Sequence, residues 1–286
     1  MLKFLTLCIS GVMLGCIYGL IALGYGLIYK ASGLMSFVQG DMLTLGAFLG
    51  LTYWLSLLLT MLCAFAFGML LEKGVIRRLL NKKVMPIYVV LATIAISYIL
   101  QNGSQLIWGT WTLNFPSVFK VSTVKLFGLL AVQPEVILCL ILSMVSMIVL
   151  HLFMNKTKLG TAMRASSMDS MAAESCGINV SLTTGITWGV SAMLAAMAGI
   201  LIGPMYGVYS SLGANLGNKG FAGAIAGGYG NMYGAIVGGI LLGLLEILVS
   251  GYVSSAYKNL IAYVALLLFL CIKPTGLFNE RAIQDV

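Results

Sequence analysis

The sequence predicts an all-α, polytopic integral membrane protein with about eight transmembrane helices, some discontinuous or re-entrant, arranged in two related halves. Of the 286 residues, 60% are apolar and 8% are charged, and the mean hydropathy is +1.03. Several apolar runs approach the roughly 20 residues that a helix needs to cross the hydrocarbon core. Helices are the default spanning elements because lipid cannot satisfy backbone polar groups. We therefore expect a single transmembrane domain over residues 1–286.

The first half begins with an apolar run over residues 5–28, which is longer than a signal-peptide core and is expected to remain as a span. Two segments then carry clustered bases, namely residues 73–83 and 155–180. The positive-inside bias places both in the cytoplasm. Spans over 84–107 and 136–154 join them, so the loop 108–134, with Trp108, Trp111, Pro116 and Pro134, is expected on the extracytoplasmic side together with the N-terminus.

In the second half, residues 182–202 are expected to return outward and 259–272 to return inward. With one span ending outside and the last span starting outside, residues 219–253 between them must begin and end outside. The sequence therefore predicts a hairpin in this segment. Its turn is expected at the glycine-rich segment 227–231, where Asn231 also disfavours a continuous helix. The arm at 220–226 is too short to cross a bilayer at about 1.5 Å per residue, which predicts a half-helix that stops within the membrane.

A similar break precedes the apolar segment 42–71, at the polar residues 32–41. Gly40-Asp41-Met42, with Gly46 and Gly50, partly matches Gly230-Asn231-Met232, with Gly234 and Gly238. Interrupted segments at corresponding places in two halves are typical of a transport site near the bilayer midplane. The alternative is two ordinary loops with similar turn residues.

Glycines spaced four apart form faces on predicted helices, at Gly11, Gly15 and Gly19, at Gly230, Gly234 and Gly238, and at the pair Gly239 and Gly243. Such faces let another backbone approach closely. We expect them to serve helix packing.

Three ionisable side chains stand out in apolar surroundings. Glu246 lies within a span, where a charge is costly unless it faces protein or water, and Asp41 and Lys219 flank the two breaks. Asp41 or Glu246 could accept a substrate ammonium, or each could form a structural hydrogen bond. The residues predicted for the translocation pathway are Phe37, Gln39, Gly40, Asp41, Lys219, Phe221, Gly228, Gly230 and Glu246.

The composition gives little support for other functions. The net charge of +8 comes mostly from bases that flank spans, so nucleic-acid binding is not expected. His151 has no partner at ligand spacing, and the six cysteines are scattered, so no metal site and no catalytic residue are expected. The phosphate-loop pattern is absent from the sequence, so any ATP hydrolysis must come from another subunit.

The polar segment 155–180 contains a predicted short helix that ends at Gly177. Ala165, Asp169 and Ala173 are spaced four apart, which would place them on one helical face that suits a cleft on a cytosolic partner. An interfacial amphipathic helix is the alternative. The residues predicted for coupling to that partner are Arg164, Ala165, Asp169, Ala173, Glu174, Gly177, Ile178 and Asn179.

Motifs along nearly the whole chain resemble those of the permease subunits of branched-chain amino acid ABC importers. The matching segments are Gly19-Leu20-Ile21-Ala22-Leu23-Gly24-Tyr25 with Ile28-Tyr29, Ser36-Phe37-Val38-Gln39-Gly40-Asp41, Leu159-Gly160, Arg164-Ala165, Gly177-Ile178-Asn179, Lys219-Gly220-Phe221, Gly227-Gly228-Tyr229-Gly230, Gly234-Ala235, Gly238-Gly239, Gly243, Glu246 and Lys273-Pro274-Thr275-Gly276-Leu277-Phe278. Relatives often have Asn-Phe-Ala-His-Gly-Glu where this chain has residues 36–41, and a longer segment in place of 42–71, so the exact substrate is left open.

The resemblance implies a multi-pass protein of the bacterial cytoplasmic (inner) membrane. The implied partners are a second permease subunit, preferably a paralogue, two cytosolic ATPase subunits that bind ATP and Mg²⁺, an extracytoplasmic amino-acid-binding protein and membrane lipid. It also implies that the segment 155–180 holds the coupling helix. A facilitator or ion-coupled secondary transporter for a small polar solute is the alternative function, and a membrane enzyme lacks any convergent set of catalytic residues.

Overall fold

The structure is a computed structural model that describes residues 2–50, 53–82, 84–114, 124–126, 130–273 and 275–278. Lys83, Pro116 and Pro274, named above, lie outside these ranges. The elements are α1 (Leu2–Ser32), α2 (Val38–Leu49), α3 (Tyr53–Leu71), η1 (Glu72–Ile76), α4 (Arg77–Asn81), α5 (Pro86–Trp108), β1 (Val124–Leu126), β2 (Leu130–Val132), α6 (Pro134–Lys156), α7 (Lys158–Met168), α8 (Ser170–Ser175), α9 (Val180–Tyr206), α10 (Leu212–Gly227), α11 (Met232–Tyr252) and α12 (Lys258–Ile272).

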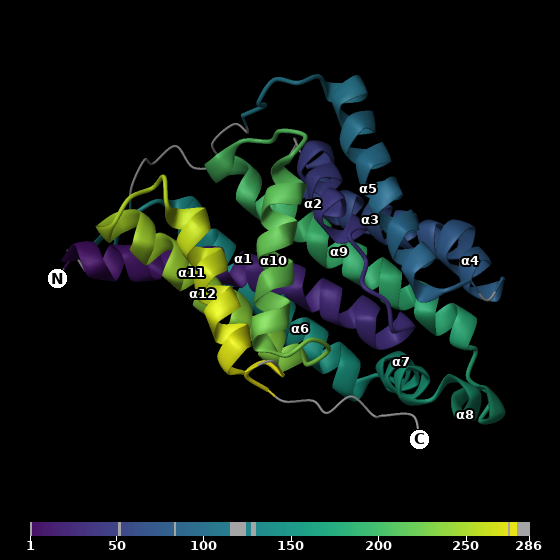
Figure 1. Ribbon diagram of the computed structural model, residues 1–286. Coiled ribbons are helices and arrows are strands. Elements are labelled where there is room, and N and C mark those ends of the chain that lie inside the picture. The colour runs from purple at the N-terminus through teal and green to yellow at the C-terminus, as the bar shows by residue number, and fades with distance from the viewer. Residues whose placement is uncertain are drawn as a thin grey trace.

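The prediction of an all-α polytopic membrane protein is confirmed (Figure 1). Within the described ranges, six helical segments are long and apolar enough to cross a membrane. Helices α2, α10 and α12 are shorter, at 12, 16 and 15 residues. Two three-residue strands, β1 and β2, form an antiparallel pair that the sequence did not predict.

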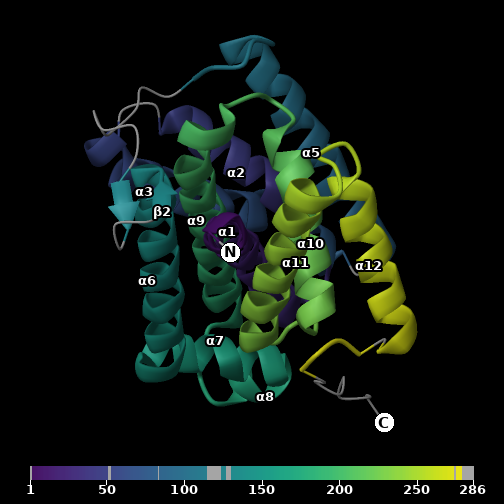
Figure 2. The same ribbon diagram turned by 90° about the vertical axis from the view of Figure 1, so that its left-hand side faces the viewer.

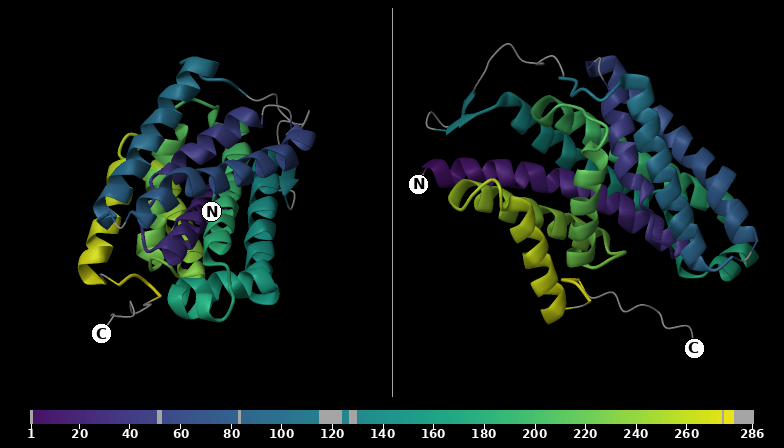
Figure 3. Two further views of the ribbon diagram at one scale, coloured as in Figure 1. Left: turned by 90° about the vertical axis from the view of Figure 1, so that its right-hand side faces the viewer. Right: turned by 45° about the horizontal axis from the view of Figure 1, so that its top comes forward.

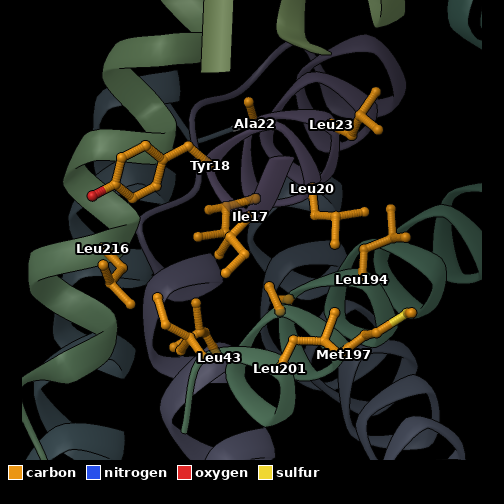
Figure 4. Close-up of a cluster of buried hydrophobic side chains, with 14 of the residues drawn as sticks. Ile17, Tyr18, Leu20, Ala22, Leu23, Leu43, Leu194, Met197, Leu201 and Leu216 are labelled. Carbon is orange, nitrogen blue, oxygen red and sulfur yellow. The ribbon is translucent and has the colours of Figure 1, made fainter. Parts of the chain in front are cut away.

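Helix α1 is the centre of the bundle and contacts α6, α9, α10 and α11 (Figure 2). Its side chains Ile17, Tyr18, Leu20 and Ile21 are fully buried. In Figure 4, side chains of α1 converge with Leu43 of α2, Leu216 of α10 and Leu194, Met197 and Leu201 of α9.

The predicted glycine faces meet each other, since Gly15 and Gly19 of α1 lie against Gly239 and Gly243 of α11. A Cβ atom added to Gly15 would lie 2.5 Å from the Cα atom of Ile240. The absence of side chains is what allows the two backbones to approach. The packing role predicted for these glycines is therefore confirmed.

The break between α1 and α2 lies where the sequence predicted it, and Gly50 follows the end of α2. The proposed match between the two breaks does not hold residue by residue. Gly40 lies inside helix α2, whereas Gly230 lies in a turn with φ of 96°. Local composition was similar, but only Gly230 occupies a backbone conformation that requires glycine.

Residues 73–81 of the basic segment are helical and not a loop as expected, because α3 continues through the π-turn η1 into α4. The buried Glu72 accepts hydrogen bonds from Arg77 at 3.0 and 2.5 Å. Arg77 also donates to the backbone carbonyl of Ser181 at the start of α9. These contacts stabilise the extra helical turns and join the two predicted cytoplasmic segments at one end of the molecule (Figure 3).

The predicted hairpin forms from α10 and α11, with its turn at residues 228–231. Helix α10 begins at Leu212, eight residues before the predicted start at 220, and its added first turns include the polar residues Asn215 and Asn218. The turn lies near the end of α1, and the N-terminus lies at the opposite end from α7 and α8 (Figure 1). Leu113, from the predicted outer loop, pairs with Val208 beyond the far end of α9, as the predicted topology requires.

Candidate functional site

Helix α2 carries the first predicted group of pathway residues. The Phe37 backbone N–H donates to Thr93 Oγ1 of α5 at 3.3 Å. Gln39 turns toward α9, where its Nε2 donates to the carbonyl of Ser191 at 2.8 Å and its Oε1 accepts from Ser191 Oγ at 2.9 Å. Gln39 therefore fixes α2 against α9 and does not line the cavity described next.

A cavity of about 230 Å³ lies between α2, α5 and α10. Its lining includes Tyr25, Phe37, Gly40, Asp41, Ser97, Gln101 and Asn218. The volume exceeds the roughly 150 Å³ of an engineered cavity that binds benzene, so a small organic solute fits. Asn218 and Tyr98 are exposed, which places the opening between α5 and α10.

Asp41 supplies the charge in this cavity. Its side chain is 2% exposed, and Oδ2 accepts a hydrogen bond from Ser97 Oγ. Oδ1 is buried and has no hydrogen-bond partner among the described residues. A buried carboxylate oxygen without a partner is costly, so a bound donor would stabilise it.

The polar face of α5 was missed by the sequence reasoning. Thr93, Ser97, Gln101 and Gln105 recur every four residues and lie on the side that faces α2 and α10. Gln105 Nε2 donates to Ser210 Oγ at 2.9 Å. The four-residue spacing of polar side chains within an apolar span was the signal that could have identified them.

Four aromatic side chains meet beside this cavity. Phe221 of α10 lies against Tyr25, Phe37 and Tyr229, with ring centroids 5.4, 5.6 and 5.7 Å apart. The structure thus brings together Phe37 and Phe221, which were both predicted for the pathway. Phe37 also lines the Asp41 cavity, whereas Phe221 contacts Phe37 and Tyr25 and is not part of that lining.

Lys219 and Glu246 form a separate buried ion pair with Nζ and Oε1 2.6 Å apart. Tyr18 donates to Glu246 Oε2 at 2.7 Å, and Lys258 Nζ lies 3.8 Å from Oε1. Glu246 is 2% exposed, so both of its oxygens are used within the protein. This group ties α1, α10, α11 and α12 together and does not line the Asp41 cavity.

Gly228 and Gly230 lie in the α10–α11 turn with φ of 109° and 96°. The chain beyond α12 docks there, where the N–H groups of Leu277 and Phe278 donate to the carbonyls of Ala226 and Gly227 at 3.0 Å. Neither glycine lines the Asp41 cavity, and Gly230 lines a second one beside Arg164.

The predicted coupling segment folds as two helices, and the expectation of one continuous helix is wrong. Asp169 separates α7 from α8 in an extended conformation, with φ of −150° and ψ of 109°. Its carboxylate accepts hydrogen bonds from the N–H groups of Met171 and Ala172 at 2.9 and 3.0 Å, which caps α8. Ala165, Asp169 and Ala173 therefore do not share one helical face.

Gly177 ends α8 as predicted, with φ of 81°. The N–H groups of Gly177 and Ile178 donate to the carbonyls of Glu174 and Ala173 at 2.9 and 3.0 Å, which closes the helix end. Asn179 Oδ1 then accepts from the Leu182 N–H at 3.0 Å and caps α9. These residues fix the geometry of the segment through its own backbone.

The exposed side chains of α7 and α8 match those predicted only in part. Ala173 is 4% exposed, whereas Met168 and Met171 are 74% and 78% exposed. Glu174 is also exposed. Arg164 turns back toward α6, where its Nη1 donates to Asn155 Oδ1 at 3.0 Å. Because Met168 and Met171 lie at the break between two short helices, their spacing does not follow a helical repeat of apolar residues. The sequence therefore did not distinguish them from buried methionines.

Within the described ranges, no group of three or more His, Cys, Asp or Glu side chains could hold a metal ion. The six cysteines are free thiols.

Comparisons with known proteins agree over the whole chain. A family profile described as "Branched-chain amino acid transport system / permease component" matches residues 7–270. The high-affinity branched-chain amino acid transport system permease protein LivH of Salmonella typhimurium strain LT2 is 30% identical, covering 100% of this chain and 98% of the relative. LivH of Escherichia coli K12 gives the same values. The corresponding protein BraD of Pseudomonas aeruginosa is 30% identical over 62% of this chain and 63% of its own length. No solved structure gives a significant match.

Proposed function

Because the chain belongs to the branched-chain amino acid transport system permease family, we propose that it is the membrane-spanning subunit of a binding-protein-dependent ABC importer. It resides in the bacterial cytoplasmic membrane and carries branched-chain or other apolar amino acids. Two cytosolic ATPase subunits hydrolyse Mg-ATP, a second permease subunit completes the core, and an extracytoplasmic binding protein delivers the substrate.

The observation that carries this proposal is the rigid projection formed by α7 and α8. Caps at Asp169 and Asn179 and the helix end at Gly177 fix its backbone. Met168 and Met171 project from it, and burying a methionine side chain contributes about 1.5–3 kcal/mol. Helix α7 packs against α1, α6 and α9, so motion of a docked ATPase subunit passes directly to three membrane helices.

Replacing Met168 and Met171 with glutamate is expected to detach the ATPase subunits. Two charges in place of two apolar side chains remove the contact area and add a desolvation cost. We expect both the amount of co-purified ATPase and the rate of amino acid uptake to fall at least tenfold. A tenfold loss of affinity corresponds to about 1.4 kcal/mol of binding free energy. The measurement is pull-down from membranes together with uptake of radiolabelled leucine.

The matched control for this variant is Met85→Glu, since Met85 is 69% exposed and lies outside the projection. It should leave both readouts unchanged. Full uptake with full ATPase retention in the Met168→Glu/Met171→Glu variant would contradict the docking role. Uptake that persists after the ATPase subunits are lost would instead favour the facilitator or ion-coupled transporter.

We infer further that the Asp41 cavity lies on the substrate path. Its unpartnered Oδ1 is an acceptor for the substrate ammonium. The rings of Phe37 and Tyr25 in its lining, with Phe221 packed against both, suit an apolar side chain. The polar face of α5 provides hydrogen-bonding groups along the same path. The Lys219–Glu246 pair joins α10 to α11 and has a structural role.

The Asp41→Asn variant is expected to lower uptake about 10–100-fold, because a hydrogen bond to a charged group contributes about 1.5–3 kcal/mol. Asp41→Glu keeps the charge and should recover much of the uptake. Uptake is compared at equal membrane levels of the protein, with ATPase retention as the control for assembly. Wild-type uptake by both Asp41→Asn and Asp41→Ala would exclude Asp41 from the path.

A further inference from the structure

A second cavity, of about 170 Å³, lies where the end of α1 meets α6, α7 and the start of α11. Lys30, His151 and Arg164 contribute positive or ionisable nitrogen to its lining, and none of the described residues that line it is acidic. Asn155, Asn231 and Tyr233 add neutral polar groups, whereas the inner part is apolar, with Leu23, Leu27, Met154, Met232 and Ala235. The cavity is thus cationic on one side and apolar on the other.

Arg164 is held in place but retains an unused donor. Its Nη1 donates to Asn155 Oδ1 at 3.0 Å, while its Nε is buried without a hydrogen-bond partner among the described residues. His151 is positioned by Asn155 at 3.0 Å and by the Tyr233 hydroxyl at 3.3 Å. A buried guanidinium N–H without an acceptor is costly, so an anionic ligand would satisfy it.

The cavity opens at the predicted cytoplasmic end of the helices. Asn155 is exposed and Tyr233 is 56% exposed, so the opening lies between α6 and α11. Both helices present apolar side chains outward along their length, including Ile148, Leu152, Leu241 and Leu245. Figure 2 shows α6 and α11 on either side of α1, with α7 crossing below them. A lipid molecule could therefore place its acyl chains on the apolar faces of α6 and α11 and its headgroup at the basic opening, which lies at the predicted cytoplasmic end.

We propose that this cavity binds the headgroup of an anionic phospholipid. The phosphate accepts hydrogen bonds from Arg164 and the Lys30 ammonium, and the glycerol and upper acyl carbons lie on Leu27 and Met232. Basic pockets between membrane helices on the cytoplasmic side are suited to anionic headgroups. A free phosphate has the same charge chemistry but makes no use of the apolar half of the cavity.

The test uses the full-length chain extracted with its native partners, then depleted of lipid. Phosphatidylglycerol, phosphatidylcholine and inorganic phosphate are titrated separately, and binding is followed by native mass spectrometry and by the shift in thermal unfolding midpoint. We expect phosphatidylglycerol to bind and stabilise. Each of Lys30→Gln and Arg164→Gln should weaken its binding about fivefold, since a cation near an anionic lipid contributes about 1 kcal/mol.

The matched control is Lys156→Gln with Lys158→Gln, because these exposed bases lie in the same segment and outside the cavity. They should leave binding within twofold of wild type. Arg164→Lys retains the charge and should bind more tightly than Arg164→Gln. Equal binding of phosphatidylcholine, an equal loss in the control variant, or full stabilisation by inorganic phosphate would each overturn the proposal. The wild-type titrations decide between these outcomes even if a variant fails to fold.

Discussion

The Glu246→Leu variant is expected to lose about 3–5 kcal/mol of stability, because it leaves the Lys219 ammonium buried without its counter-charge. The Lys219 side chain is 9% exposed, and Glu246 Oε1 lies 2.6 Å from its Nζ. The lost carboxylate also removes the acceptor for the Tyr18 hydroxyl. The measurement is the thermal unfolding midpoint of the purified protein, followed by size-exclusion chromatography after heating.

The double variant Glu246→Leu/Lys219→Met removes both charges and is expected to recover most of that loss, since an apolar pair can replace a buried ion pair at little cost. Glu174→Leu serves as a control because Glu174 is exposed on α8. If the double variant is no more stable than Glu246→Leu, the loss does not arise from an unpaired Lys219.

The Gly15→Ala variant is expected to destabilise the bundle by about 1–3 kcal/mol, as overpacking does in a close-packed interior. The added Cβ would lie 2.5 Å from the Cα atom and 2.8 Å from the carbonyl oxygen of Ile240, so α1 and α11 must move apart. Backbone atoms cannot rotate out of the way as a side chain can. The unfolding midpoint and the yield of folded protein report the effect.

The same substitution at Gly103 provides the comparison. Gly103 lies in α5, and a Cβ added there meets nothing within 4 Å. Alanine favours the helix over glycine by up to about 1 kcal/mol, so Gly103→Ala should be neutral or stabilising. Equal effects of the two substitutions would show that helix propensity, and not the α1–α11 contact, determines the result.

Much of the fold could be predicted because membrane insertion restricts the chain to helices of a known length. The spans at α1, α5, α6 and α9 and the α10–α11 hairpin followed from apolar runs, basic segments and parity. Errors fell where polar residues lie inside helices. Helix α10 begins earlier than expected. Helix α3 continues into α4 through the basic segment, where Arg77 bonds to Glu72 and to the Ser181 carbonyl of α9.

The candidate site was predicted only in part. Phe37 and Asp41 line one cavity and Phe221 packs against Phe37, but Ser97 and Gln101 of α5 were not identified from the sequence. Glu246 accepts hydrogen bonds from Lys219, 27 positions away in the sequence, and from Tyr18, 228 positions away. No local sequence pattern specifies contacts over such separations.

The sequence by itself determined the class of protein, the order and approximate limits of most spans, the glycine faces and the end of α8 at Gly177, because these depend on hydrophobicity, charge and local backbone preferences. Only the tertiary structure decided which polar side chains share a cavity, which carboxylate forms an ion pair and which methionine side chains are exposed. Those outcomes depend on contacts between helices distant in sequence. Asp169 illustrates the difference, since its hydrogen bonds to two backbone N–H groups end one helix and begin another, leaving Met168 and Met171 exposed.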